Sequence, residues 1–310
     1  MPETPAFDIL GIGTVAVDDV IHVARYPEAD RKEPVTFEER QLGGQIGTAL
    51  AAAAAMGAAC AYAGVLGEDD LSAAVKHGLR TAGVDCTHLV KQDGTGPIHS
   101  TIVADDSAHT RNIFFNLGPI RPLAPSRVTP ELVGKAKVLL VDQLGAETHV
   151  AAADCARGLG VPVVGDMEWP DAPGWQDLVE RIDHLILPLD FARAATGLIE
   201  PAEIVHKLHT ATPRACTAVT YGADGCVFLT AGDQAVRRQK AFDVRVVETT
   251  GCGDVFHGAY CMALARGDAP TDCMVWAAAA AAAYASRPVG WPHLPDRADV
   301  EALIRRQNGT

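Results

Sequence analysis

The sequence predicts an α/β fold: a three-layer αβα sandwich with a mainly parallel central sheet, and a small β-sheet lid beside it. The first observation is that short, continuously apolar segments alternate with segments of helical spacing along most of the chain. Strands that are apolar on both faces are typical of parallel sheets covered by helices. The second observation is that two other segments show period-two alternation, which indicates half-exposed strands of a separate sheet.

The core strands are expected where aliphatic residues run together. An alanine-rich helix at Thr48–Met56, ended by a turn at Gly57, is expected between the first two strands, Phe7–Leu10 and Cys60–Leu66. The later strands are expected at Val138–Asp142, Val161–Asp166, His184–Leu187 and Ala215–Thr220, with helices at Thr148–Leu159 and Glu200–Thr210 between them. Ligands of such sheets bind at the carboxyl ends of the strands, so the functional residues are expected there.

The lid is expected to consist of residues 14–40 and 98–117. Apolar residues alternate with polar ones at Val15 and Val17, and again at Ile21 and Val23, before a turn at Pro27. The core then comprises residues 1–13, 41–97 and 118–310. A strand layer lying over the strand ends would exclude water from the site.

The composition excludes several classes of protein. The 310 residues include 26 Lys and Arg against 39 Asp and Glu, so the formal net charge is 26 − 39 = −13. This acidic surplus argues against binding to nucleic acid or to anionic membranes. The residues are 48% hydrophobic and 5% aromatic, which is typical of a globular core of Ala, Val and Leu rather than of a disordered chain.

Neither a membrane segment nor a disulfide framework is expected. The uncharged stretch of residues 48–67 is long enough to span a bilayer, but it is mostly Ala and Gly and is interpreted as a buried helix, a turn and a strand. The start of the chain lacks the basic residues and apolar centre of a signal peptide. The eight cysteines include no CxxC pair, and we expect a cytoplasmic protein with reduced thiols and no zinc.

The strongest local motif is Glu248-Thr-Thr-Gly-Cys-Gly-Asp254, between an expected strand at Phe242–Val247 and an alanine-rich helix. Gly251 and Gly253 allow consecutive backbone N–H groups to converge, and the helix dipole adds to their attraction for a phosphate or a developing negative charge. Asp254 could deprotonate an attacking hydroxyl. From the motif alone, a helix cap with loop-forming glycines is an equally good interpretation.

Two other glycine clusters have ordinary structural interpretations when each is considered alone. Thr220-Tyr-Gly-Ala-Asp-Gly225 is typical of a hairpin turn, although its backbone could contact a nucleotide. Gly43-Gly44 precedes the first alanine-rich helix, where glycines allow close helix packing or the close approach of a ligand.

Two common routes to nucleotide binding are absent from the sequence. Gly11-Ile-Gly13 after the first strand imitates the dinucleotide fingerprint, but period-two strands follow where that fingerprint requires a helix. No P-loop motif G-x-x-x-x-G-K-[ST] occurs. Asp18 and Asp19 lie within the strand pattern, where a carboxylate pair is either solvated or binds hydroxyl groups.

Asp166 and Glu168 are candidate ligands of hydrated Mg²⁺. They lie at the end of the strand Val161–Asp166 and carry the oxygen atoms that Mg²⁺ prefers. A strand-end turn before Pro170 is an equally good interpretation. His257, one helical turn after Asp254, is expected to be a packed or hydrogen-bonded structural residue.

Taken together and in order, these motifs resemble the ribokinase-like, or PfkB-type, carbohydrate kinases. The matching segments are Gly11-x-Gly13 with Asp18, Gly43-Gly44, Gly64-Val-Leu-Gly-Glu-Asp69, Thr220–Gly225 and Thr249–Asp254. The resemblance covers nearly the whole chain, and the ordered set is more specific than any one motif. It implies an enzyme that uses ATP and Mg²⁺, with an α/β core and a β-sheet lid, which agrees with the fold expected above.

The resemblance also implies roles for individual residues. Asp254 is then the catalytic base, and the backbone of Gly251, Cys252 and Gly253 forms the anion hole. The other implied contacts are Asp18, Gly43, Gly44 and Thr48 for the substrate and Thr220, Gly222 and Gly225 for ATP. Lids of this family often contribute to a dimer, so a homodimer through the lid is expected.

The chain departs from the family pattern at three places. The family often has Asn where Thr48 stands and Asp where Glu248 stands. Its N-x-x-E motif, which is linked to Mg²⁺ and phosphate, should fall at Pro188–Phe191 but is missing. Asp166 and Glu168 therefore remain the metal candidates. Ketohexokinase-like members also lack that motif, so the chain is expected to lie nearest that branch.

The expected function is transfer of the ATP γ-phosphoryl group to a hydroxyl of a sugar or sugar derivative, such as a ketohexose or ribose. Three alternatives stay open. A nucleoside kinase could bind ribose hydroxyls at Asp18, and a non-catalytic sugar or nucleotide sensor could have kept the fold. A phosphosugar kinase would need a cationic pocket, which Arg25, Arg31, Lys32 and Arg111 could supply.

Overall fold

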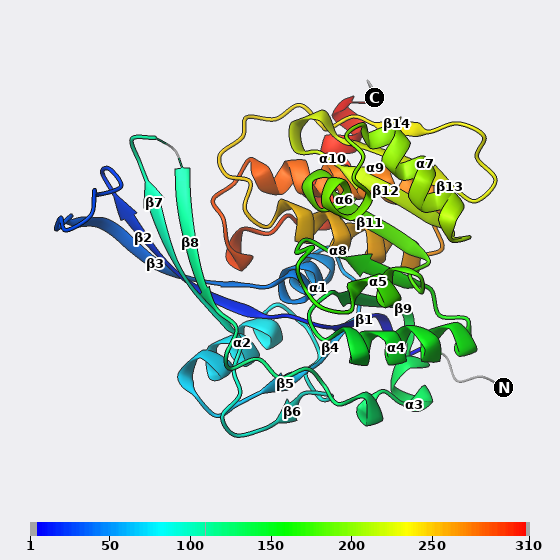
Figure 1. The fold of residues 1–310 in the computed structure, drawn as a ribbon, viewed down its shortest axis with the longest axis horizontal. Coiled ribbons are helices and arrows are strands. Elements are labelled where there is room, and N and C mark those ends of the chain that lie inside the picture. The colour runs from blue at the N-terminus through cyan, green and yellow to red at the C-terminus, as the bar shows by residue number, and fades with distance from the viewer. Residues whose placement is uncertain (1–4, 109, 308–310) are drawn as a thin grey trace.

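The computed structural model describes residues 5–108 and 110–307, and its centre is an eight-stranded sheet (Figure 1). The order of the strands is β14-β13-β12-β11-β10-β9-β1-β4. Neighbouring strands from β4 to β12 are parallel, whereas β13 and β14 are added antiparallel at one edge. The strands are β1 Phe7–Ile12, β4 Cys60–Ala63, β9 Ala136–Asp142, β10 Val163–Asp166, β11 His184–Pro188, β12 Cys216–Thr220, β13 Cys226–Thr230 and β14 Arg237–Gln239.

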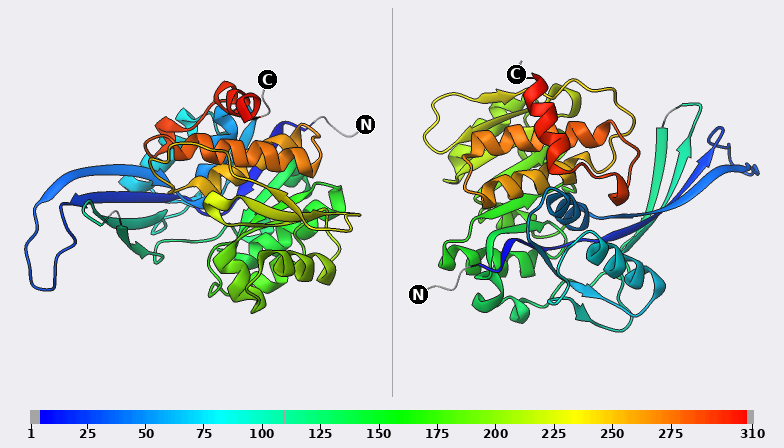
Figure 2. Two further views of the ribbon diagram at one scale, coloured as in Figure 1. Left: turned by 90° about the horizontal axis from the view of Figure 1, so that it is seen from above. Right: turned by 180° about the vertical axis from the view of Figure 1, so that it is seen from behind.

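Helices cover both faces of this sheet and bury one apolar cluster on each face (Figure 2). One cluster includes side chains of α1 (Gln45–Ala55), α2 (Asp70–Thr81), α8 (Cys252–Ala265), α9 (Pro270–Ala285) and α10 (Arg297–Gln307). The other includes side chains of α3 (Pro130–Val133), α4 (Ala146–Leu159), α5 (Trp175–Val179), α6 (Leu189–Thr196) and α7 (Pro201–Ala211). Consecutive strand residues such as Ile9 and Leu10 belong to opposite clusters, as the pleat requires. The predicted three-layer sandwich is therefore confirmed.

The strand expected at Cys60–Leu66 is divided into two. Cys60–Ala63 forms β4, and the chain then leaves the central sheet, so that β5 (Val65–Leu66) pairs with β6 (Val90–Lys91) in a separate two-stranded sheet. The division falls at Gly64, where a side chain would collide with the hydroxyl of Tyr62. Tyr62 instead donates a hydrogen bond to the Gly13 carbonyl, at 3.0 Å.

The strand expected at Phe242–Val247 is wrong, because this segment is an extended loop. The amide of its last residue, Val247, and that of the following Glu248 donate to the carbonyl of Ala285 at the end of α9 rather than to a neighbouring strand. Phe242 packs into the core, but Val246 and Val247 are more than half exposed. Two of the three aliphatic residues that predicted a strand therefore lie on the surface, and Val244 is half-buried against the core.

The second sheet has four strands in the order β3-β2-β7-β8, and we call it the lid sheet. The strands are β2 (Ala16–Val23), β3 (Val35–Gly43), β7 (Ile98–Asp105) and β8 (Thr110–Asn116). Strands β2 and β7 are parallel, and the other two pairs are antiparallel. The sheet extends away from the core (Figures 1 and 2). Both expected strand segments are found, and β3 continues beyond residue 40 to Gly43.

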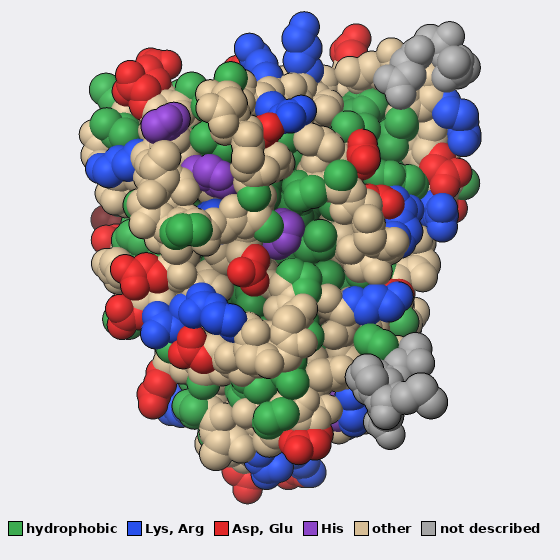
Figure 3. Space-filling view, turned by 90° about the vertical axis from the view of Figure 1, so that its right-hand side faces the viewer, with side chains coloured by type: hydrophobic (Ala, Val, Ile, Leu, Met, Phe, Trp, Pro, Cys, Tyr) green, Lys and Arg blue, Asp and Glu red, His purple; other side chains and the backbone are tan. Residues whose placement is uncertain are grey.

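Charged side chains of both signs are interspersed on the face of the core shown in Figure 3. That face carries no large patch of one sign. Within residues 5–108 and 110–307, no helix is both long and apolar enough to cross a bilayer.

Candidate active site

The turn Gly251–Asp254, which we call the anion turn, opens helix α8. Gly251 caps the helix with φ of +78°, a left-handed conformation that favours glycine. A Cβ added to Gly253 would meet no atom within 4 Å, so its backbone is open to a ligand. The free N–H groups of the first helical turn and the helix dipole favour a negatively charged group at this point.

Helix α1, which begins directly after the glycines of residues 43–44, packs tightly against α8. Gly258 of α8 makes this packing possible, since a Cβ there would collide with the backbone of Ala49 in α1. Thr48 is 4% exposed, and a Cβ added to Gly251 would lie 3.7 Å from the Thr48 methyl group. Its hydroxyl accepts a hydrogen bond of 3.1 Å from Nε1 of Trp291. Thr48 thus supports the anion turn, and Trp291 is a contributor that the sequence analysis missed.

Asp254 is partly exposed in the first turn of α8. Even so, desolvation by the surrounding protein raises its pKa well above the usual carboxyl range, and four other carboxylates add to the effect. They are Asp166, Glu168, Asp18 and Asp142, and together with Asp254 we call them the acidic cluster. A carboxylate with a raised pKa is a better proton acceptor than an ordinary aspartate, as a general base requires.

Asp142 is the member of the acidic cluster that the sequence analysis missed. It is the last residue of β9 and is fully buried. Its two carboxylate oxygens accept hydrogen bonds from the amides of Thr14, at 2.6 Å, and Leu144, at 2.9 Å. Burial raises its pKa to about 7. The available signal was its position at the end of an expected strand, which is also the position of Asp166.

Asp166 and Glu168 are held in place by two glutamines. Gln45, at the start of α1, donates to the carbonyl of Asp166 at 3.2 Å and accepts a hydrogen bond from Gln143 at 3.1 Å. Gln143 in turn accepts from the amide of Glu168 at 3.0 Å. Both glutamines are buried. This chain of hydrogen bonds fixes the end of β10 against α1.

The carboxylates of the two metal candidates, Asp166 and Glu168, differ in their solvent exposure. Asp166 is 5% exposed; its Oδ2 lies 3.3 Å from Nδ1 of His257 but has no hydrogen-bond partner among the described residues. Glu168 is solvent-exposed, yet surrounding protein raises its pKa to about 7, with the Asp166 carboxylate as a second cause. The described residues hold no group of three metal-ligating side chains. Two carboxylates completed by water and phosphate oxygens fit Mg²⁺, which seldom uses an all-protein cage.

His257 is a buried, hydrogen-bonded residue, as expected. Its two ring nitrogens lie 2.9 Å from the carbonyl of Gly253 and 3.2 Å from that of Ile186 in the middle of β11. The ring therefore ties the anion turn to the central sheet, and its exposed fraction is only 4%.

Asp18 approaches the core from the lid sheet. Its Oδ2 lies so close to Gly43 that an added Cβ would be 2.7 Å away. Gly44 has φ of +85°, and a Cβ there would be 2.5 Å from the Cα of Val15. Burial raises the pKa of Asp18, while its hydrogen bond with Ser100 opposes that rise. The Asp18 carboxylate therefore lies beside the backbone of the two glycines.

Thr220, Gly222 and Gly225 lie apart from the acidic cluster. They form the turn between the antiparallel strands β12 and β13, as the hairpin interpretation predicts. Gly222 is exposed and has φ of +65°, with no atom within 4 Å of an added Cβ. Strand β12 is two strands from β10 in the sheet. The turn therefore lies about 10 Å from the end of β10, along the same edge of the sheet.

Glu248 and Arg111 form a contact that joins the anion turn to the lid sheet. Oε1 of Glu248 accepts hydrogen bonds from the amides of Thr249 and Thr250, at 2.8 and 3.0 Å, and from the Thr250 hydroxyl at 2.9 Å. The same oxygen accepts from Nη1 of Arg111 in β8, at 3.1 Å. Arg111 therefore forms an ion pair with the Glu248 carboxylate.

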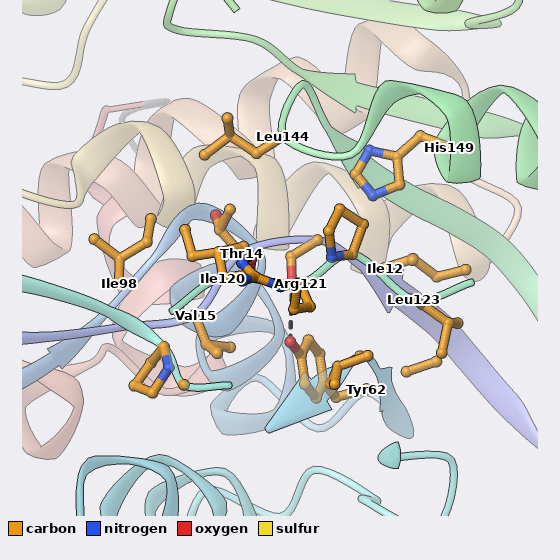
Figure 4. Close-up of a pocket in the computed structure, with 17 residues that line it drawn as sticks. Ile12, Thr14, Val15, Tyr62, Ile98, Ile120, Arg121, Leu123, Leu144 and His149 are labelled. Atoms are coloured by element: carbon orange, nitrogen blue, oxygen red, sulfur yellow. Dashed lines mark hydrogen bonds between the residues drawn. The ribbon is translucent and has the colours of Figure 1, made fainter. Parts of the chain in front are cut away.

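A small cavity is lined by the turn Gly13–Thr14 and by residues of the segments around Tyr62, Arg121 and His149 (Figure 4). Its volume is about 30 Å³, enough for one or two water molecules. Tyr62, Arg121 and His149 contribute its polar lining. None of the residues predicted for catalysis, substrate, ATP or metal lines it.

Comparison with known proteins identifies the family. The family model described as "pfkB family carbohydrate kinase" matches residues 11–292. The chain belongs to the pfkB family. It is therefore a carbohydrate kinase, a phosphotransferase with an alcohol group as acceptor, as the ordered motifs implied.

Named relatives within the pfkB family share about a quarter of their residues with this chain. A ribokinase of Arabidopsis thaliana is 23% identical over 307 residues, with 95% of this chain and 80% of the relative covered. A 5-dehydro-2-deoxygluconokinase of Bacillus subtilis is 22% identical, with 99% and 98% covered. These relatives support membership of the pfkB family. They are ribokinases and 5-dehydro-2-deoxygluconokinases, so the expectation that the chain lies nearest the ketohexokinase-like branch is not supported.

Solved structures show the same fold. A candidate ribokinase of Agrobacterium tumefaciens has a TM-score of 0.89 at 25% identity, with 98% of this chain and 99% of that chain covered. Arabidopsis thaliana ribokinase, solved with ribose and ATP, has a TM-score of 0.84 at 22% identity, with 97% and 99% covered. The α/β sandwich with a lid sheet is thus a known pfkB architecture.

Proposed function

We propose that this kinase transfers the γ-phosphoryl group of ATP to a hydroxyl of an uncharged sugar or sugar derivative, with Asp254 as the general base. The observation that carries the proposal is the position of Asp254 in the anion turn. Its carboxylate directly follows the backbone N–H groups that would receive the phosphoryl group, and its raised pKa suits proton abstraction.

The acceptor hydroxyls would be held by Asp18 together with the backbone at Gly43 and Gly44. Asp18 belongs to the lid sheet and Asp254 to the core, so an acceptor between them would contact both parts. This arrangement would orient one hydroxyl toward Asp254 and exclude bulk water, which otherwise competes for the phosphoryl group.

The nucleotide would lie along the same edge of the central sheet. Thr220, Gly222 and Gly225 are the proposed ATP contacts, and the amides of Gly251, Cys252 and Gly253 would stabilise charge on the transferring group. Asp166 and Glu168 would hold Mg²⁺ together with water and phosphate oxygens. Bound Mg²⁺ would neutralise charge on the phosphates. We also propose that the enzyme acts in the cytoplasm, where ATP is supplied.

The charges around Asp254 favour an uncharged acceptor over a phosphosugar. Four other carboxylates act on Asp254, and Arg111, the lid cation that contacts the core at Glu248, is paired with that carboxylate. Arg25, Arg31 and Lys32 lie in the connection between β2 and β3, at the end of the lid sheet away from the core. A phosphorylated acceptor would therefore meet net repulsion.

An acceptor panel with measurement of ADP release tests this function. Neutral pentoses, hexoses, nucleosides and sugar phosphates would be compared at saturating ATP and Mg²⁺. We expect turnover with a neutral sugar and a loss of at least about a hundredfold in Asp254→Asn, with ATP affinity nearly unchanged. Turnover confined to nucleosides would favour the nucleoside kinase. Near-normal rates in Asp254→Asn would contradict the assignment of the base.

We further propose that the kinase forms a homodimer through the lid sheet. Every residue of the edge strand β8 is exposed. The lid sheet also carries large apolar side chains on its surface: Val35, Phe37, Ile113, Phe114 and Phe115. Exposed apolar surface next to an unpaired strand edge favours association with a second copy.

A further inference from the structure

Strand β8 contacts the core at two loops that belong to the candidate active site. Arg111 reaches Glu248, the residue that begins the loop leading into the anion turn. Phe115 packs edge-on against Trp169, with 6.3 Å between ring centroids, and Trp169 follows the metal candidate Glu168. Arg111 and Phe115 are four residues apart in one strand, so they lie on the same face of the lid sheet.

That face is also the one that carries Asp18. Asp18 lies opposite Ser100 in the register of β2 and β7, and Ser100 lies opposite Phe115 in the register of β7 and β8. Residues opposite one another on neighbouring strands share a face. The side of the lid sheet that would contact the acceptor is therefore the side attached to the anion turn through Arg111.

We propose that Arg111 and Glu248 are positioning residues that couple the lid sheet to the anion turn, so that closure over the acceptor also orders the turn that receives the phosphoryl group. This inference rests on the proposed function for its catalytic consequence. Its structural part, the coupled order of β8 and the anion turn, does not depend on which acceptor is used.

The side-chain length of Glu248 matters for this coupling. Three of the four donors to its Oε1 belong to Thr249 and Thr250, so the loop alone already fixes the carboxylate. Arg111 therefore donates to a carboxylate oxygen whose position the loop already fixes. The two residues are 137 positions apart in the sequence. Aspartate is shorter by one carbon–carbon bond, about 1.5 Å, and it could keep the loop contacts while losing Arg111.

The solvent exposure of Arg111 and Glu248 limits how much their ion pair can contribute to stability. The side chains of Arg111 and Glu248 are 39% and 38% exposed, and an exposed ion pair adds little to global stability. The pair would therefore bias the position of the lid sheet rather than hold the fold together. When the lid sheet moves away, Glu248 keeps its threonine donors but loses the link that transmits acceptor binding.

The variants Glu248→Asp, Arg111→Gln and the double variant test the coupling. With the best acceptor of the panel, we expect each single variant to lower kcat/KM by about three- to tenfold, mainly through kcat. Each should also raise the ADP formed per phosphorylated product. The double variant should be no worse than the single variants, because they break the same link. Arg40→Gln is the matched control, since it breaks an ion pair of the same kind with Asp19 within the lid sheet.

Amide hydrogen exchange provides a readout that does not need turnover. Glu248→Asp should raise exchange both in β8, residues 110–116, and in residues 249–254, with the melting temperature unchanged. Faster exchange in residues 249–254 alone would overturn the coupling, and so would additive losses in the double variant. If the wild-type chain phosphorylated no acceptor, the proposed function would fail, and the exchange result alone would decide whether the two segments are coupled.

Discussion

Asp18 and Asp19 are adjacent in sequence but belong to opposite faces of β2. Asp18 lies on the face toward Gly43, whereas Asp19 pairs with Arg40 at 2.7 Å and with His99 at 2.8 Å. These partners lower the pKa of Asp19 to about 2, while burial raises that of Asp18. The alternation of the strand thus separates a candidate ligand from a surface ion pair.

Neutralising each of these aspartates gives a matched pair of variants. Asp18→Asn should raise the acceptor KM by about ten- to a hundredfold, because a carboxylate that binds hydroxyl groups is lost. Asp19→Asn should leave KM within about twofold. Steady-state kinetics on both variants checks this, and equal effects would show that Asp18 has no special role.

The pH dependence of kcat/KM should report Asp254. The base works only when deprotonated, so the rate falls as the pH drops below its pKa and reaches a plateau above it. Because that pKa is raised, the fall should begin at a higher pH than for an ordinary aspartate, and approach tenfold per pH unit. A pH–rate profile measures this, and the residual activity of Asp254→Asn should lack the acid limb.

The sequence predicted site residues where a local pattern marks them. Gly251, Gly253 and Asp254 belong to one turn, so their pattern can be read in seven consecutive letters. Gln45 and Gln143 are 98 positions apart and meet only because α1 crosses the end of β9. Trp291 reaches Thr48 from 243 positions away. Such contacts depend on tertiary packing, and no local pattern reveals them.

At the scale of elements, the packing of α1 against α8 decides whether the proposed acceptor and phosphate surfaces meet. The two helices approach closely because Gly258 leaves room for the backbone of Ala49. Continuous apolar runs predicted the strands of the core and alanine runs predicted these helices, but helical periodicity did not show which helices touch. The extended loop at residues 242–247 was missed because aliphatic residues on a surface loop resemble a strand.

Gly258→Ala should destabilise the protein by about 1–3 kcal/mol, because the added methyl group forces α1 away from α8. It should also lower kcat, since Thr48 and Gly44 move relative to Gly251. Gly158→Ala in α4 is the control: its added methyl group meets no atom within 4 Å, and alanine favours a helix by about 0.5–1 kcal/mol. Urea unfolding and kinetics on both variants test this, and a stable, fully active Gly258→Ala would refute it.

At the scale of the whole molecule, the lid sheet offers an apolar surface that one chain leaves uncovered. If two copies associate there, light scattering should give twice the chain mass of 32.6 kDa. Phe114 is 56% exposed in β8, and Phe114→Ser should shift the mass toward one chain. Ile199 on the core is 68% exposed, and Ile199→Ser should not. A single-chain mass for the wild type at all concentrations would contradict the dimer.

The eight cysteines have a consequence for how the enzyme withstands oxidants. None is in a disulfide, and burial raises the pKa of every one of these thiols. The thiol form is poorly nucleophilic, so alkylation and peroxide should act slowly on the native protein. In the anion turn, Cys252 directs its sulfur to the carbonyl of Ala281, and its pKa is raised to about 12. Treatment with iodoacetamide should therefore leave the activity intact, because the Cys252 sulfur in the anion turn stays uncharged.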